Sequence, residues 1–434
     1  MTSPQFDQSI PSALEILQQE FGDADSETTL IRDPFGVLTV VLPDSTLCNW
    51  DVLAQRLHNT LGRFSPGERQ VLLRQSDLID PDDVIRSPDR IRIPNAPATW
   101  LVDRLQTNQD WIRAPLCTHP PLPTAVAFSI KGGVGRTSAF AVWAWHLARL
   151  GKDVLLIDLD LEAPGVASVL LDEAHIPDYG LIDWLIEAQN GAVDNALLRE
   201  TLVDCALAQD TPGRLRVLPA FGRKSRDYIA KLGRIYLPAW SEGHQAYFGL
   251  AERLKLLLES IAGLAEAPQL VLLDARAGLH DIGSAAVTRL GAEVFLFARD
   301  DAQTWAAYRH LFRQLALSRG VSFGMQEDDL RHRLTMVGAQ TDSTESAARR
   351  LVEHSFLAWT DELYDAEADP KGMESFEMME DTAPHYPLRI GFDPRLRGLE
   401  LNHSNTLPEW GIVKSAFGPF LNGATARLLP DGFA

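Results

Sequence analysis

The chain has 434 residues, of which 45% are hydrophobic and 23% charged, and its formal net charge is −19. This length allows a large core and about two domains, while the acidic charge argues against non-specific coating of DNA or RNA, whose phosphates it repels. No apolar run approaches the roughly 20 residues that span a bilayer, and the scattered cysteines show no disulfide or zinc spacing. We therefore expect a cytoplasmic protein with no membrane and no nucleic-acid partner.

Residues 1–118 are expected to form a separate small α+β domain that carries no chemical motif. Its alternating apolar runs predict a hairpin, and the capping-box spacing of Ser65 and Glu68 predicts a helix. We interpret this domain as the part that contacts an unknown protein partner. The expected elements are a hairpin of residues 29–32 and 37–42, helices at 65–75 and 100–111, and a strand at 90–93.

A proline-rich linker at residues 114–124 precedes a change in pattern. Beyond it, near-continuous apolar runs alternate with amphipathic stretches, which is typical of a mainly parallel sheet covered by helices on both faces. We predict such an α/β domain for residues 119–402, followed by a C-terminal tail at 403–434. The expected strands are 125–130, 154–158, 215–219, 270–274, 294–298, 334–338 and 388–392, and the main expected helices are 139–150, 303–317 and 344–356.

The most informative segment joins the first of these strands to a helix and reads SIKGGVGRTS over residues 129–138. A glycine-rich turn at a helix N-terminus directs backbone N–H groups and the helix dipole to one point, which creates an anion site. Glycine lets the backbone approach a phosphate that a Cβ would obstruct. The segment therefore predicts a nucleotide phosphate site. Its candidate binding residues are Gly132, Gly133, Val134, Gly135, Arg136, Thr137 and Ser138.

Acidic residues follow two other predicted strands. Asp158 and Asp160 lie at the end of one apolar run, and Asp274 closes another, with Gly278 shortly after it. Because ligands of parallel sheets bind beyond the carboxyl ends of the strands, we expect these carboxylates near the glycine loop. A capping Asp at the end of a buried strand is the simpler reading of Asp274 alone, but the order of the three segments favours a nucleotide site.

Taken together, these segments resemble the deviant Walker A, switch I and Walker B motifs of ParA/MinD-type ATPases over roughly residues 124–400. The resemblance implies a P-loop NTPase sheet that uses ATP and Mg²⁺. Lys131 resembles the signature lysine, which in this family reaches across a sandwich dimer to the partner's nucleotide. A homodimer bridged by nucleotide is therefore implied, and a surface lysine without this role is the alternative.

The same resemblance assigns roles to individual residues. Amides of the loop would surround the β-phosphate, Ser138 would contact the α-phosphate, and Gly278 would give its N–H to the γ-phosphate. Asp160 resembles the switch I carboxylate that orients the attacking water. The implied catalytic residues are Lys131, Arg136, Asp160 and Asp274, the implied Mg²⁺ residues are Thr137, Asp160 and Asp274, and Phe392, Asp393 and Pro394 resemble the strand end that lies against adenine.

Arg136 departs from the family pattern, which has lysine at this position. A guanidinium is longer and planar, keeps its positive charge and can pair with phosphate bidentately, so nucleotide binding is expected to survive. Whether the planar fork still follows the charge that develops during phosphoryl transfer is open. Slow hydrolysis and nucleotide sensing without turnover are the two outcomes we consider.

The resemblance thus implies a nucleotide-dependent dimerising ATPase that hydrolyses ATP slowly and regulates a partner in a bacterial multi-gene, defence-type system. ATP is favoured over GTP by family habit. One alternative is a catalytically degenerate P-loop scaffold, and a second is a DNA-partitioning ATPase, which the net charge disfavours. The basic stretch at residues 214–234 is open to partner or nucleic-acid contacts, but a solvated loop that pairs with acidic neighbours is the preferred reading.

Overall fold

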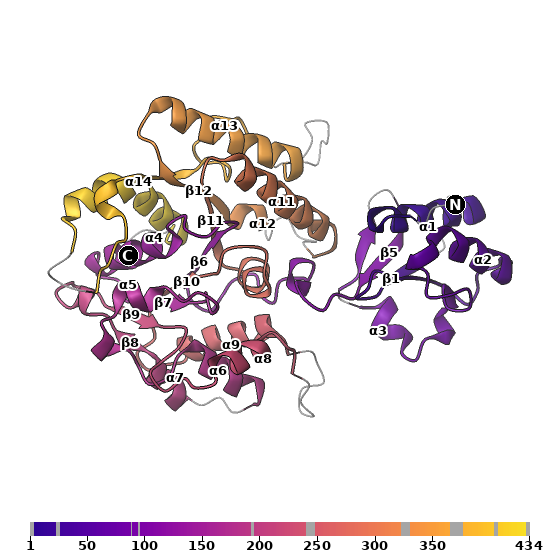
Figure 1. Ribbon diagram of the computed structural model, residues 1–434, viewed down its shortest axis with the longest axis horizontal. Helices are drawn as coiled ribbons and strands as arrows, with labels where there is room; N and C mark the ends of the chain where they lie inside the picture. Colours follow the sequence, from indigo (N-terminus) through magenta and orange to yellow (C-terminus); the bar gives the residue numbers. More distant parts are fainter. Residues whose placement is uncertain are drawn as a thin grey trace. The chain divides into compact units, whose positions relative to one another are not determined.

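The computed structural model describes residues 4–22, 27–87, 89–93, 96–191, 195–239, 248–322, 330–364, 376–402 and 407–430. These residues form two compact units, a first one within Met1–Ala114 and a larger one that comprises Pro115–Ala316 and Met325–Ala434 (Figure 1). Each unit has its own sheet, of five strands in the first and eight in the second. The expected class is confirmed, since a small α+β unit precedes a large α/β unit.

In the first unit, two helices cover a sheet of order β3-β2-β1-β5-β4. The predicted hairpin is confirmed, because β1 and β2 pair antiparallel around a turn at residues 33–36. The buried faces of α1 and α2 meet Leu30, Leu38 and Val40 of the sheet. The elements are α1 Phe6–Phe21, β1 Thr28–Arg32, β2 Leu38–Leu42, α2 Trp50–Leu61, β3 Leu72–Arg74, α3 Pro81–Ile85, β4 Ile91–Ile93 and β5 Ala96–Asp103.

Two helices expected in this unit are wrong. The helix at residues 65–75 does not form, because Gly67 adopts a φ of 115° that no helix allows and the following residues pair with β2 as strand β3. The helix at 100–111 is replaced by the end of β5, which pairs with both β1 and β4, and by a short 3₁₀ turn at Gln109–Trp111. In both places non-local strand pairing overrides the local pattern. The strand expected at 90–93 is confirmed as β4.

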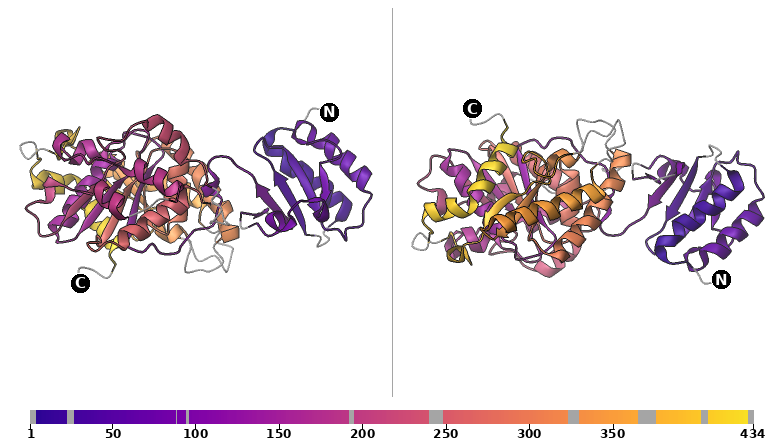
Figure 2. Two further views of the ribbon diagram at one scale, coloured as in Figure 1. Left: turned by 90° about the horizontal axis from the view of Figure 1, so that it is seen from below. Right: turned by 90° about the horizontal axis from the view of Figure 1, so that it is seen from above.

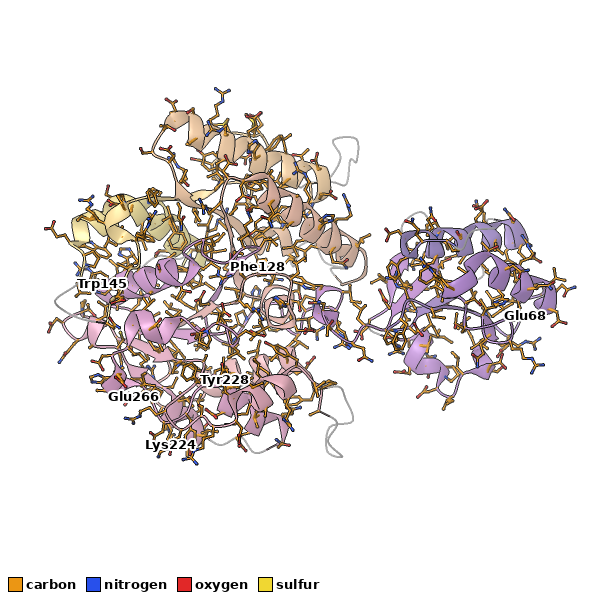
Figure 3. All side chains as sticks on the ribbon, viewed as in Figure 1. Glu68, Phe128, Trp145, Lys224, Tyr228 and Glu266 are labelled. Carbon is orange, nitrogen blue, oxygen red and sulfur yellow. The ribbon has the colours of Figure 1, made fainter. Side chains whose placement is uncertain are left out.

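The sheet of the larger unit has the order β13-β12-β11-β6-β10-β7-β9-β8, and only its β8–β9 pair is antiparallel. Every strand predicted for this unit is confirmed. The central strand β6, which includes Phe128 (Figure 3), is buried on both faces, and this explains its continuous apolar run. The strands are β6 Thr124–Ser129, β7 Val154–Asp158, β8 Val203–Asp204, β9 Leu215–Leu218, β10 Leu270–Asp274, β11 Glu293–Ala298, β12 Leu334–Thr341 and β13 Leu388–Gly391.

Helices cover both faces of this sheet (Figure 2). On one face lie α4 and α14, while α11 and α13 pack against each other through Phe312 and Trp359, and Leu351 of α13 lies against Gly338 of β12. The helices are α4 Arg136–Arg149, α5 Val166–Leu170, α6 Leu181–Gln189, α7 Asn195–Thr201, α8 Tyr228–Ile235, α9 Leu250–Ala262, α10 Asp281–Ser284, α11 Ala302–Ser322, α12 Leu330–Arg333, α13 Glu345–Glu362 and α14 Trp410–Leu428. None of the described helices is long and apolar enough to cross a membrane.

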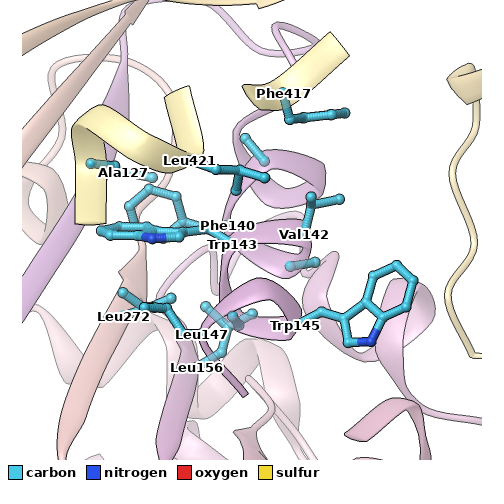
Figure 4. Close-up of a cluster of buried hydrophobic side chains, with 14 of the residues drawn as sticks. Ala127, Phe140, Val142, Trp143, Trp145, Leu147, Leu156, Leu272, Phe417 and Leu421 are labelled. Atoms are coloured by element: carbon cyan, nitrogen blue, oxygen red, sulfur yellow. The ribbon is translucent and has the colours of Figure 1, made fainter. Parts of the chain in front are cut away.

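Helix α14 lies within the segment expected as a tail, and the sequence pattern did not reveal it. It packs Phe420 into the core beside Trp143 of α4, and the Trp143 indole N–H donates to Thr425 Oγ1 at 3.0 Å. Figure 4 shows Phe417 and Leu421 of α14 in the same cluster as Trp143. One of the glycines that obscure its periodicity, Gly423, allows close packing. A Cβ on Gly423 would overlap the side chain of Leu388 in β13.

Candidate functional site

The glycine loop connects β6 to α4 as the sequence predicted. Gly133 and Gly135 have φ values of 71° and 87°, in the left-handed region that glycine adopts without strain, and α4 begins directly after Gly135. A Cβ built on Gly132 or Gly133 would have no atom within 4 Å, so this side of the loop faces open space. The first N–H groups of the 14-residue helix α4, which have no partner within the helix, lie next to this space.

Three carboxylates lie at the neighbouring strand ends. Strand β10 pairs with both β6 and β7, in a register that places Asp274 opposite Ala127 and Asp158. Asp158 is fully buried and accepts hydrogen bonds from the N–H groups of Asp160, Gly165 and Val166. Burial and the nearby Asp274 raise the pKa of Asp158. Asp158 therefore shapes the turn that presents Asp160.

Thr137 and Asp274 are joined directly beneath the loop. The Thr137 hydroxyl donates to Asp274 Oδ2, and Asp274 is fully buried at the end of β10. Its second oxygen, Oδ1, has no hydrogen-bond partner among the described residues. Burial raises the pKa of Asp274 to about 6, although the charge of Arg136 and the Thr137 hydrogen bond oppose this rise. The pair thus holds one buried carboxylate oxygen ready for a further partner.

Arg136 reaches back to the same carboxylates. Its side chain is 7% exposed, and its Nη1 donates to Ser129 Oγ at 2.8 Å. Its Nη2 lies 3.6 Å from Asp160 Oδ2 and its Nε lies 3.9 Å from Asp274 Oδ1. The guanidinium is therefore directed at groups on the ends of three strands. A shorter lysine side chain could not contact all of them at once.

Lys131 is bound within its own chain. Its Nζ lies 2.7 Å from Asp301 Oδ1, which also accepts the N–H of Thr304 in the first turn of α11. A second contact reaches the loop from β12, because Gln340 Nε2 donates to the carbonyl oxygen of Gly133 at 3.1 Å. Asp301 and Gln340 were not predicted from the sequence. Asp301 follows β11 and Gln340 lies near the end of β12, both distant in the chain from the loop, and no local motif marks them.

The remaining predicted residues lie along the same edge of the sheet. The N–H of Gly278 donates to the Ser129 carbonyl at 2.8 Å, so the amide expected at a γ-phosphate is bound to β6 in this structure. Ser138 lies in the first turn of α4. Phe392, Asp393 and Pro394 follow β13, which β12 and β11 separate from β6, and Asp393 pairs with Arg395.

A cavity of about 210 Å³ lies beside strands β11 and β12. Along the sheet, it is nearer to the loop than Phe392, Asp393 and Pro394, the residues expected to lie against the base. It is formed at the ends of β11 and β12 and by the start of α13, and it includes Asp301 and Gln340, which both contact the loop. Two arginines, Arg299 and Arg350, also line it. Sequence reasoning did not find this cavity, because its lining comes from three separate segments.

The residues at the loop fit a magnesium ion only together with a nucleotide. No group of three or more His, Cys, Asp or Glu side chains within the described ranges is arranged to hold a metal ion. Magnesium commonly binds through one or two carboxylates, water and substrate phosphates. The site offers two carboxylates, those of Asp274 and Asp160, and the hydroxyl of Thr137. The unpartnered Asp274 Oδ1 is available to the ion or to a water molecule bound to it.

The basic stretch at residues 214–234 is paired with acidic neighbours. Arg214 contacts both Asp204 and Glu266, while Lys224 contacts Asp178. These pairs confirm the expected acidic partners, but the stretch is not a loop, since it contains strand β9 with the buried Arg216 and helix α8.

No protein-family model and no curated protein matches the sequence. Among solved structures, the chain is similar to the McdA–ATP complex of Cyanothece, with 14% identity and a TM-score of 0.44 over 71% of this chain and 97% of that one. It is similar to a ParA-family ATPase of Chlorobium tepidum, with 13% identity and a TM-score of 0.42 over 71% and 98% of the two chains. It is also similar to the septum site-determining protein MinD of Pyrococcus horikoshii with Mg-ADP, with 17% identity and a TM-score of 0.39 over 69% and 96%.

Proposed function

We propose that the larger unit binds ATP with Mg²⁺ at the loop between β6 and α4 and hydrolyses it slowly. In this proposal the nucleotide-bound form is a homodimer in which Lys131 reaches the partner's nucleotide. The first unit then couples that state to a protein partner in a multi-gene, defence-type system.

The position of Thr137 and Asp274 beneath an open glycine loop carries the proposal. A buried carboxylate oxygen without a partner costs free energy, so such an atom is expected where a ligand or ordered water meets it. The open space beside Gly132 and Gly133 lies at the positive end of α4, where a phosphate is stabilised. A phosphate-bound cation fits this combination of an anion site and a carboxylate.

In this proposal different residues of the chain bind the phosphates, hold the magnesium ion and orient the attacking water. Backbone N–H groups at the start of α4 bind phosphate oxygens, and Thr137 and Asp274 would hold Mg²⁺, which neutralises charge between the β- and γ-phosphates when bound. Asp160, whose side chain is 13% exposed, accepts the N–H of Ala163 and keeps a fixed orientation. In this proposal Asp160 orients a water molecule and accepts its proton.

The placement of Arg136 supports slow turnover. Its charge is directed at Ser129, Asp160 and Asp274, whereas a loop lysine would be free to follow the phosphate oxygens. The same observation favours a second candidate function, a P-loop scaffold that binds nucleotide and recruits partners without turnover. The two candidates differ only in phosphate release.

Light scattering of the full chain with and without ATP and MgCl₂, combined with phosphate-release kinetics, tests the proposal. We expect the mass to double with ATP and phosphate release to depend on Asp160. ATP binding without phosphate release from the wild type, and no effect of Asp160→Ala, would favour the scaffold. No change in mass and no bound nucleotide would refute both candidates.

A further inference from the structure

One carboxylate outside the predicted site joins three separate segments of the larger unit. Glu162 lies two residues after Asp160, and its Oε1 is 3.0 Å from Nη1 of Arg276, which lies two residues after Asp274. The same Oε1 accepts the hydroxyl of Tyr236, the residue directly after α8. The loops that carry Asp160 and Asp274 are thus tied to each other and to the end of α8.

A second hydrogen bond attaches the beginning of α8 to the same loop. The hydroxyl of Tyr228, the first residue of α8 (Figure 3), donates to the carbonyl oxygen of Leu161. Both ends of α8 therefore contact two consecutive residues, Leu161 and Glu162, which directly follow Asp160. A displacement of this loop acts on the whole helix.

Helix α8 is also fastened to its neighbours in the unit. Lys231 pairs with the buried Asp183 of α6, and the fully buried Arg253 of α9 donates to the carbonyl oxygens of Ile235 and Leu237. The opposite face of α8 meets solvent, since Ile229 is 84% exposed. The helix thus connects the Asp160 loop on one side with the protein surface on the other.

The role of Glu162 goes beyond that of a residue in a surface ion pair. Its side chain is 20% exposed and that of Arg276 is 30% exposed, and Glu162 Oε2 is buried without a hydrogen-bond partner among the described residues. Exposed ion pairs contribute little, but a half-buried carboxylate that accepts both a guanidinium and a phenol fixes the geometry of its neighbours.

We propose that Glu162 is a positioning residue that couples the Asp160 and Asp274 loops to α8 through Arg276 and Tyr236. The inference rests on the proposed nucleotide site, because ATP bound there is what moves the two loops. Helix α8 then reports the state of the site at the protein surface. Glu162 itself touches no reacting atom.

Amide hydrogen exchange of α8, measured by mass spectrometry on the full chain with and without ATP and MgCl₂, tests this coupling. In the wild type we expect ATP to change the exchange rates of the α8 amides several-fold. In Glu162→Gln, which keeps the shape but loses the ion pair, and in Tyr236→Phe, which loses only the hydroxyl, ATP should still bind within a few-fold of the wild-type affinity. The α8 response should be reduced several-fold in both variants, because only the hydrogen bond from Tyr228 to the Leu161 carbonyl then ties α8 to the loop.

Glu266→Gln is the matched control. It removes a carboxylate that pairs with Arg214 away from the loop, and its α8 response should equal that of the wild type. A wild-type response in Glu162→Gln and Tyr236→Phe would overturn the coupling, as would wild-type ATP binding with no change in α8. Failure of the wild type to bind ATP would instead refute the proposed function, so the two failures are distinct.

Discussion

Arg136 and Asp274 face each other across 3.9 Å, and the facing atoms, Arg136 Nε and Asp274 Oδ1, both lack a hydrogen-bond partner among the described residues. This separation exceeds that of a hydrogen bond, so the two charges attract each other without closing a direct contact. Arg136 is instead held by its hydrogen bond to Ser129 and by its charge near Asp160 and Asp274, and the expected slow turnover follows from this restraint.

Arg136→Lys is expected to raise the rate of ATP hydrolysis. The shorter ammonium gives up the contacts with Ser129 and the carboxylates and becomes free to follow the phosphate oxygens. A gain of about tenfold corresponds to about 1.4 kcal/mol of transition-state stabilisation. Phosphate-release kinetics measure the change, and adding Asp160→Ala to the variant should abolish the gain. An unchanged rate in Arg136→Lys would mean that the arginine does not limit turnover.

Asp301→Asn should favour ATP-dependent dimerisation. The substitution removes the ion pair that holds Lys131 within its own chain, while the amide oxygen can still accept the N–H of Thr304. Both side chains of the pair are about one-third exposed, so the pair contributes no more than about 1 kcal/mol, which limits the gain in dimer affinity to about fivefold. Sedimentation at several protein concentrations measures it. Lys131→Ala is the control, and a dimer of wild-type affinity in this variant would contradict the role of Lys131.

Thr425→Val should destabilise the larger unit although it keeps the shape of the side chain nearly unchanged. The buried Trp143 indole N–H loses its acceptor, and a buried donor left unpaired costs about 1–3 kcal/mol. Thr425→Ser keeps the hydroxyl and should retain most of the stability. Urea unfolding followed by tryptophan fluorescence compares the variants. The interpretation fails if Val is tolerated as well as Ser.

The stability of the larger unit should depend on pH through Glu293. Burial raises the pKa of Glu293 to about 7 from an ordinary value of 4.5, although Arg427 and Arg333 oppose the rise. The carboxyl of Glu293 binds its proton more tightly in the folded chain than in the unfolded chain. Its contribution to the free energy of unfolding is therefore fully present below the unfolded pKa of 4.5 and is lost as the pH rises through the folded pKa of about 7.

Glu293→Gln cannot titrate and serves as the reference for this effect. The unfolding free energy of the wild type relative to Glu293→Gln should fall by about 2 kcal/mol between pH 5 and pH 8. Urea unfolding at the two pH values measures the difference. A constant difference across this range would show that Glu293 has an ordinary pKa.

The sequence predicted the larger sheet well because its strands are buried on both faces. A continuous apolar run such as 270–274 fits a strand that helices cover on both faces. The first unit was predicted less well, since β3 and β5 form through pairing with distant strands and Gly67 prevents the expected helix. Helix α14 escaped prediction because its three glycines weaken the helical pattern, and the contact of Gly423 with β13 appears only in the folded chain.

Some residues of the candidate site could likewise be predicted from the sequence, and others could not. Thr137, Asp160 and Asp274 could be proposed from the sequence because each lies beside a local motif. Asp301 and Gln340 lie at strand ends far along the chain, and nothing near them in the sequence indicates contact with the loop. The direction of the Arg136 side chain likewise depends on where Ser129 and the carboxylates lie after folding, so the substitution was visible in the sequence but its consequence was not.

Calorimetric titration of the full chain with ATP in the presence of MgCl₂ decides whether the loop is a nucleotide site. We predict saturable binding of one ATP per chain. In Thr137→Ala the affinity should fall at least about tenfold, or about 1.4 kcal/mol, because a ligand is lost. Thr137→Ser keeps the hydroxyl and should bind ATP like the wild type. An absence of saturable binding by the wild type, or equal binding by Thr137→Ala, would contradict the assignment.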